Sequence, residues 1–205
     1  MYAIVTDGSI SKYINHPKSL VIGDVRYPAK IFSLWSSTEL NAIGIYEVTF
    51  DNSNKKDEQW YINTNQSFAY DASAGTVTAT YGSATAKDHA DRNATDEDGN
   101  NILDKDGNQV INYGLKTQLI KTLKQQVANE LARTDWYITR NTEKSTAIPS
   151  AISTHRDAVR TKQEEMETAI TNASNTPALE TLYTYTEQED KSVTRPLGEL
   201  PTLEI

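Results

Sequence analysis

The spacing of apolar residues along this chain of 205 residues changes from a period of two to a period near four. Tyr46, Val48 and Phe50 alternate with polar residues, as expected of a half-buried strand. Similar short runs occur at residues 2–5, 10–14, 20–28, 59–62, 67–70 and 76–81. We therefore expect a small, antiparallel, β-rich lobe over residues 1–82.

Two local signals add detail to this lobe. The Asp7-Gly8 pair lies between two apolar runs and predicts a hairpin. Ser36 followed by Glu39 is a capping box, which predicts a short helix over residues 38–43, and Gly44 is placed to end it. The expected product is a short helix packed on a sheet.

After Gly114 the apolar residues follow the period of a helix. One face of this helix carries Leu115, Leu119, Leu123, Val127 and Leu131, and the helix should end near Arg133. Pro149 is well placed in the first turn of a second helix, whose apolar residues are mostly seven apart: Ile152, Val159, Met166 and Ile170. Because this seam is thin, the second helix should pack on the first or on a partner chain. The prediction is a helical hairpin over residues 115–173.

Two polar segments flank this hairpin. Residues 83–114 are rich in Asp, Asn and Gly, and contain a near-repeat, residues 96–101 and 104–109. A calcium loop would need an oxygen ligand at position one, where the two registers place Ala94 and Ile102. A β-hairpin connector with Asp-Gly-Asn turns is the favoured interpretation, with Ile102, Leu103, Val110 and Ile111 on its strands. Residues 174–205 should form an extended tail, with one short helical turn near Pro177.

Composition narrows the function classes. A hydrophobic content of 37% predicts a modest core, and a formal net charge of -8 disfavours nonspecific binding to nucleic acid or to an anionic membrane. The absence of cysteine excludes disulfides, thiolate catalysis and cysteine-ligated metals. The N-terminal residues lack the basic and apolar segments of a signal peptide, and no run is long enough to span a membrane. We expect a soluble α+β protein made in a cytoplasm.

No catalytic constellation is apparent. His16, His89 and His155 are far apart in sequence, and a structural hydrogen bond or a solvent-facing position suits His155 better than general-base catalysis. There is no Gly-Xaa-Ser-Xaa-Gly motif and no phosphate-binding glycine loop. The sequence therefore indicates a protein that is not an enzyme, with no cofactor and no metal.

Several segments resemble a known family. Residues 106–116, residues 132–143, the Ile148-Pro149 pair and residues 156–160 resemble the C-terminal domain shared by tail-fibre and tail-assembly-chaperone-like proteins of tailed bacteriophages. Residues 27–48 are similar to a segment common near the start of such proteins. The resemblance implies a phage tail protein and brings no catalytic residues.

The most specific part of the resemblance predicts a clasp between the two helices. It comprises Trp136, Arg140, Glu143, Arg156 and Arg160. We expect the Trp136 ring to be buried where the helices meet. Arg140, Glu143 and Arg156 should form a charged cluster that orients the turn.

The leading hypothesis is a structural protein of the virion, in the tail fibre or baseplate region, made in the bacterial host cytoplasm. Its partners would be other phage tail proteins, or further copies of itself. One alternative is a tail-fibre assembly chaperone that is absent from the particle. Another is a tail-tip enzyme that degrades glycans, which would require two carboxyl groups about 5 to 10 Å apart in a cleft.

Overall fold

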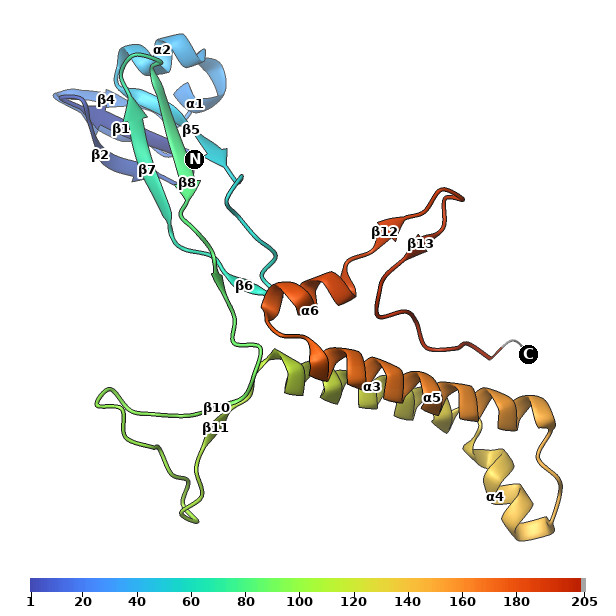
Figure 1. Ribbon diagram of the computed structural model, residues 1–205. Helices are drawn as coiled ribbons and strands as arrows, with labels where there is room; N and C mark the ends of the chain where they lie inside the picture. The colour runs from blue at the N-terminus through green and yellow to red at the C-terminus, as the bar shows by residue number, and fades with distance from the viewer. Residues whose placement is uncertain (204–205) are drawn as a thin grey trace. The chain divides into compact units, whose positions relative to one another are not determined.

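Alternating apolar residues in the first eighty-five positions build a five-stranded sheet in the computed structural model, which describes residues 1–203 (Figure 1). The strands, in the order in which they pair, are β2 (Ser9–Ile14), β1 (Tyr2–Thr6), β5 (Ile45–Asp51), β8 (Thr76–Tyr81) and β7 (Gln66–Asp71). Only β5 and β8 run parallel; the other pairs are antiparallel. The sheet curls, so the rings of Tyr13 and Phe68 on its two edge strands lie 4.7 Å apart.

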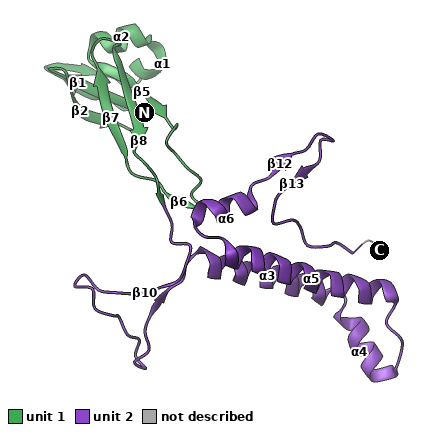
Figure 2. Cartoon of the chain, in the orientation of Figure 1, with its two compact units in different colours: residues 1–85 green, residues 86–205 purple. Residues whose placement is uncertain are grey.

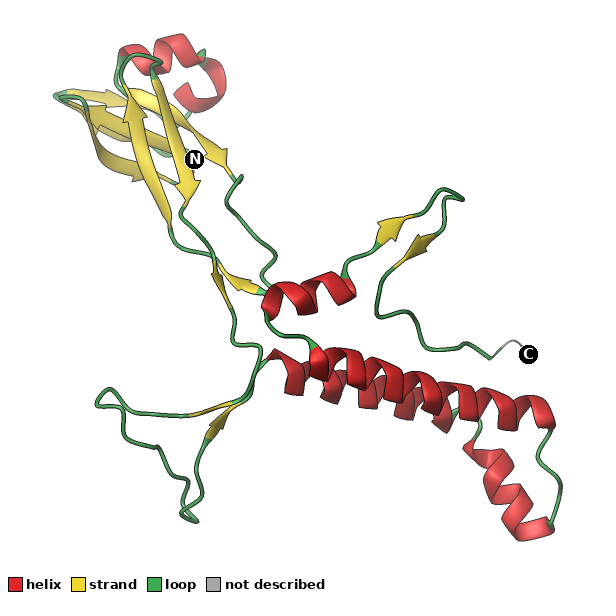
Figure 3. Ribbon diagram, in the orientation of Figure 1, coloured by secondary structure: helices red, strands yellow, loops and turns green. Residues whose placement is uncertain are grey.

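The α+β class is confirmed, and the chain divides into two compact units, residues 1–85 and 86–205 (Figures 2 and 3). The sequence predicts four segments instead, with boundaries after residues 82, 114 and 173. The helical hairpin, the tail and the connector, apart from its residues 83–85, therefore belong to the second unit.

Each face of the first unit's sheet has its own core. Successive residues of a strand point to opposite faces, so Ala3 packs in one cluster and Ile4 in the other. The cluster around Ile4 is covered by α1 (Ile31–Leu34), α2 (Ser37–Ala42) and the hairpin of β3 (Leu20–Ile22) and β4 (Val25–Tyr27).

The capping box before α2 is confirmed. The Ser36 backbone N–H donates to Glu39 Oε2, and the Glu39 N–H donates to Ser36 Oγ. Gly44 ends this segment with φ of 80°, and a Cβ there would lie 2.7 Å from the Val5 carbonyl oxygen. Glycine is therefore required at position 44 by both conformation and space.

Two predicted strands of this unit differ in the structure. Residues 20–28 form the β3–β4 hairpin rather than one strand, because Gly23 adopts a left-handed conformation with φ of 57°. Residues 59–62 contribute only the short β6 (Tyr61–Ile62), which pairs with β9 (Thr85–Ala86). Trp60 is buried beside it.

The connector contains more turns and backbone pairings than the single hairpin that the sequence predicts. β10 (Arg92–Asn93) pairs with β11 (Ile111–Asn112), and beyond this pair the backbones of Ala94, Ile102 and Val110 form a three-way junction. Three backbone hydrogen bonds of 2.8 to 2.9 Å form this junction. The Ala94 N–H donates to the Val110 carbonyl, the Val110 N–H donates to the Ile102 carbonyl, and the Ile102 N–H donates to the Ala94 carbonyl. Residues 96–101 and residues 104–109, the two copies of the near-repeat, each form a turn between these residues, which a two-strand prediction does not include.

The Asp residue at the start of each turn stabilises that turn by accepting backbone hydrogen bonds. Asp96 Oδ1 accepts hydrogen bonds from the backbone N–H groups of Asp98 and Asn100. Asp104 makes the same two contacts in the second repeat. These bonds keep the pKa of both carboxyl groups below its ordinary value. The carboxylates at the start of both copies of the repeat therefore form hydrogen bonds within their own turns.

The predicted helical hairpin is present, with an additional helix between its arms. α3 (Leu115–Ala132) and α5 (Ser150–Asn172) lie side by side, and α4 (Asp135–Lys144) fills the segment where the sequence predicts only a turn. Buried residues of α3 and α5 line the predicted seam between these helices: Leu115, Leu123, Val127, Ile152, Val159, Met166 and Ile170. Among residues 1–203, no helix has the length and apolar character needed to cross a membrane.

The tail is more regular than the sequence indicates. It contains α6 (Thr176–Tyr183), capped by the Asn175 side chain, and a hairpin of β12 (Thr186–Glu187) and β13 (Val193–Thr194). The Leu197 N–H donates to the Leu182 carbonyl, and the Leu197 side chain is buried.

Candidate docking surface on α4

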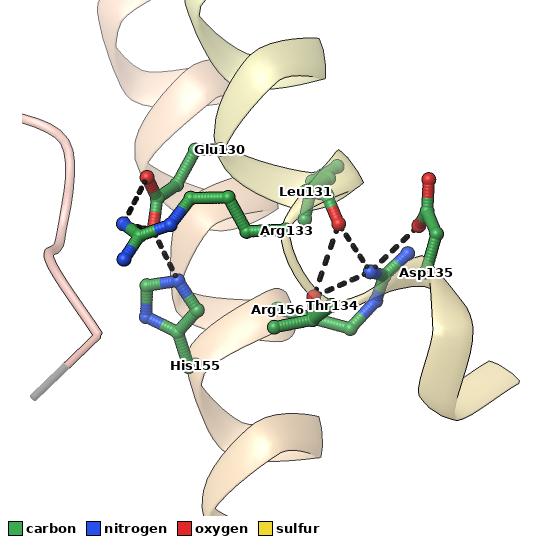
Figure 4. A network of polar contacts seen from close by, with 7 residues as sticks. All are labelled: Glu130, Leu131, Arg133, Thr134, Asp135, His155 and Arg156. Atoms are coloured by element: carbon green, nitrogen blue, oxygen red, sulfur yellow. Dashed lines mark hydrogen bonds and ion pairs between the residues drawn. The ribbon is translucent and has the colours of Figure 1, made fainter. Parts of the chain in front are cut away.

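The junction of α3 and α4 is held by one arginine from α5. The Nη1 atom of Arg156 lies 2.8 Å from the Leu131 carbonyl oxygen, 2.7 Å from Thr134 Oγ1 and 2.9 Å from the Asp135 carboxylate (Figure 4). We call these four residues the junction cluster. They come from the end of α3, the linking residues, the start of α4 and the first turns of α5, so one side chain connects all three helices.

Burial makes this cluster structurally important. Arg156 is 8% exposed and Thr134 is 2% exposed. A buried guanidinium is tolerated only where acceptors surround it, and losing an acceptor leaves a charge with a large desolvation cost. Thr134 Oγ1 also donates to the Leu131 carbonyl at 3.0 Å. The direction in which α4 leaves α3 is therefore strongly specified.

A second polar contact lies one turn away. His155 Nε2 is 3.0 Å from Glu130 Oε1, and Arg133 Nη1 is 3.0 Å from Glu130 Oε2 (Figure 4). Burial raises the pKa of the Glu130 carboxyl, but the hydrogen bond and charge of Arg133, together with His155, outweigh that effect and hold the pKa below its ordinary value. His155 is buried and makes a structural hydrogen bond, which was one of the two alternatives expected; the other, a solvent-facing position, is wrong.

Held in this way, α4 presents aromatic groups at its surface. None of its residues is buried, and Trp136 is 51% exposed. The Trp136 and Tyr137 ring centroids are 3.8 Å apart, and the Arg140 guanidinium lies 4.7 Å from the centroid of Trp136 and 5.4 Å from that of Tyr137. These three residues form what we call the α4 surface, in which stacking restricts each side chain.

The expected burial of Trp136 is wrong. The site between the helices is occupied by Thr134 and Arg156, so the indole lies on the outside of α4. Residue spacing alone does not show this, because the sequence predicts a turn in this segment rather than a helix. In an α-helix, Trp136 shares a face with Arg140, four residues later, and they contact each other there.

The predicted charged cluster of Arg140, Glu143 and Arg156 is also wrong. Arg156 pairs with Asp135, and Arg140 stacks on the two rings. Glu143 is exposed, and no ion pair involves it within the described chain, residues 1–203. Arg160 makes an exposed pair with Asp157, at 3.2 Å on its own helix.

Sequence reasoning missed Glu130, Thr134 and Asp135 as parts of the junction. One signal was available on α5. Ile152 and Val159 are seam positions, and the residues that complete the seam between them are His155 and Arg156. Polar residues within an apolar seam require partners on the facing helix. Which partners these are depends on where α3 ends.

No cluster of three or more His, Asp or Glu side chains is placed to hold a metal ion within the described part of the chain, residues 1–203. The surface depressions on α3 and α5 are shallow and lined by single helices. Comparison with models of known families, with curated proteins and with solved structures finds no match.

Proposed function

We propose that this protein is a structural component of a tailed-phage virion, in the tail fibre or baseplate region, and that it docks on another tail protein through the α4 surface. The resemblance of residues 132–143 and 156–160 to phage tail proteins supports the setting. The observation that carries the docking role is the stack of Trp136, which is 51% exposed, with the half-buried Tyr137 and Arg140 on a helix that the junction cluster holds in place.

The chemistry of the α4 surface suits protein recognition. Residues that dominate binding energy at protein interfaces are enriched in Trp, Tyr and Arg. Their mutual stacking and the junction cluster reduce the conformational entropy that docking would otherwise cost. The partner that fits is a protein surface with a pocket for an indole ring and acceptors for a guanidinium.

The setting is tested by quantitative mass spectrometry of purified particles of the phage that encodes this chain. A structural role predicts a fixed copy number relative to the major tail proteins. Presence in infected cells together with absence from particles would instead identify an assembly chaperone, and would overturn the proposal.

The docking role is tested with Trp136→Ala. Because half of the side chain is exposed and its contacts lie within α4, the free energy of unfolding should fall by about 1 kcal/mol or less. Incorporation into particles should nevertheless fall sharply. Chemical denaturation and particle mass spectrometry measure the two effects.

Trp35→Ala is the matched control, since Trp35 is a partly exposed tryptophan of the first unit, in edge contact with Tyr27. It should leave incorporation unchanged. Full incorporation of a folded Trp136→Ala chain would show that the α4 surface is not the docking site.

A further inference from the structure

Two shallow hollows of opposite charge lie on the outer faces of the helical hairpin. The α3 hollow is lined by Thr117, Ile120, Lys121, Lys124 and Gln125. The α5 hollow is lined by Thr161, Glu164, Glu165, Thr168 and Ala169. Each combines small or aliphatic groups with two charges of one sign, which are basic on α3 and acidic on α5.

Some of these charges lack an ion-pair partner among the described residues. Neither Lys121 nor Glu164 makes an ion pair with any other residue in the range 1–203 that the structure describes. Lys124 contacts Glu167 at 3.4 Å across the hairpin, and Glu165 contacts Lys162 on its own helix. The two hollows are therefore complementary to each other, yet a single copy cannot bring them together, because they face away from the seam.

Both hollows lie at the same level along the hairpin. Lys116 Nζ donates to the Thr171 carbonyl near one end, and Arg156 donates to the Leu131 carbonyl near the other. The residues of both hollows fall between these two contacts. The Lys124–Glu167 ion pair crosses the hairpin within the stretch that contains both hollows. The α3 and α5 hollows therefore face different directions but lie at the same position along the long axis of the hairpin.

We propose that the α3 hollow of one copy binds the α5 hollow of a second copy, and that the copies form a closed ring. Such a contact is heterologous, because it joins two different surfaces. It produces a closed ring when each copy is related to the next by a rotation without translation along the rotation axis. Because the two hollows lie at the same position along the hairpin, no such translation is needed. Neighbouring helices then run antiparallel across each interface, as α3 and α5 already do within one copy.

Apolar contact and charge have separate roles in this interface. Exposed ion pairs contribute about 0 to 1 kcal/mol each, so their main effect is to select and orient the partner. The area to be buried comes from half-buried Ile120 and Ala169 and from the lysine stems. Only Leu115, Leu123 and Val127 are buried among the 18 residues of α3, and helices depend on packing for most of their stability.

The inference concerns self-association and does not depend on a phage setting. Its first test is sedimentation equilibrium of the full chain at low and high salt. We expect one discrete oligomer of small copy number, whose association weakens in 1 M salt, where the screening length is about 3 Å. A monomer at every concentration, or open-ended growth with concentration, would overturn the closed ring.

The second test reverses the charges. Lys121→Glu or Glu164→Lys alone should weaken association about tenfold per interface, because attraction becomes repulsion. The double variant, with both reversals in one chain, should recover assembly, since the charges are complementary again. Lys105→Glu, an exposed reversal in the connector, is the control and should have no effect. Circular dichroism verifies that each variant is folded, and a double variant no better than the singles would contradict the proposed contact.

Discussion

Arg156 and Arg160 lie one helical turn apart on α5 and have the same side chain, but their environments are opposite. Arg156 is buried among the acceptors of the junction cluster, whereas Arg160 is exposed and, among residues 1–203, pairs only with Asp157. Their spacing in sequence placed both in the clasp. Burial decides which of them stabilises it.

Arg156→Ala should lower the free energy of unfolding by about 2 to 3 kcal/mol, because it removes charged hydrogen bonds and leaves the buried Thr134 hydroxyl and Leu131 carbonyl with fewer partners. Arg160→Ala is the matched control and should change that free energy by about 0.5 kcal/mol or less. Urea unfolding of both variants measures the difference. Equal losses would show that the junction cluster is not the source of stability.

The pH dependence of stability should contain a contribution from Glu130. Its carboxyl has a pKa below 4.5 in the folded chain, so it stabilises the fold above that pH, and the stabilisation is lost as pH falls through the folded pKa. In Glu130→Gln, the free energy of unfolding should decrease less steeply with acidification below pH 4.5 than in the wild type.

Arg133→Gln serves as the companion variant in this acid titration, because it removes the cation next to Glu130 and keeps His155. It should flatten the acid limb in the same direction and to a smaller extent. An acid limb of unchanged slope in Glu130→Gln would exclude a contribution from this carboxyl.

At the scale of elements, the start of α3 depends on a residue far away in sequence. Its N-cap is Gly114, which has no side chain to accept a hydrogen bond. Asp91 supplies the missing acceptors: its carboxylate accepts from the Gly114 N–H at 2.8 Å and from the Thr117 hydroxyl at 2.9 Å. The Leu115 N–H donates to the Asp88 carbonyl. A cap 23 positions before its helix is invisible to local sequence patterns.

Asp91→Ala should destabilise the second unit by about 1 to 2 kcal/mol, the usual cost of losing an N-terminal cap and its negative charge. Asp88→Ala is the control, since its side chain makes only an exposed ion pair with Arg92 in the part of the chain that the structure describes. Thermal unfolding of the two variants compares them directly. A larger loss in Asp88→Ala would show that the cap assignment is incorrect.

Elements were predictable where the signal is local. The capping box at Ser36, the stop at Gly44 and the start of α5 after Pro149 each depend on a few consecutive residues. α4 and the three-way junction were missed, because hydrogen bonds between distant residues, such as Ala94 and Val110, decide them.

At the scale of the whole molecule, the two core clusters of the first unit consist entirely of residues from 1–85. A chain limited to residues 1–85 should therefore fold by itself and unfold cooperatively, since small domains with their own core usually do. Circular dichroism during urea unfolding tests this, and a chain without a cooperative transition would show that the first unit needs the second.

The sequence alone determined the α+β class, the β-rich beginning, the helical hairpin with its thin seam, and the short capped helix. These follow from periodicity and capping, which are properties of neighbouring residues. Only the tertiary structure decided that Trp136 is exposed, that Arg156 meets Thr134 and Asp135, and that Asp91 caps α3. The physical reason is that burial and pairing depend on which segments meet in space, and residues 21 or more positions apart carry no local signal of that meeting.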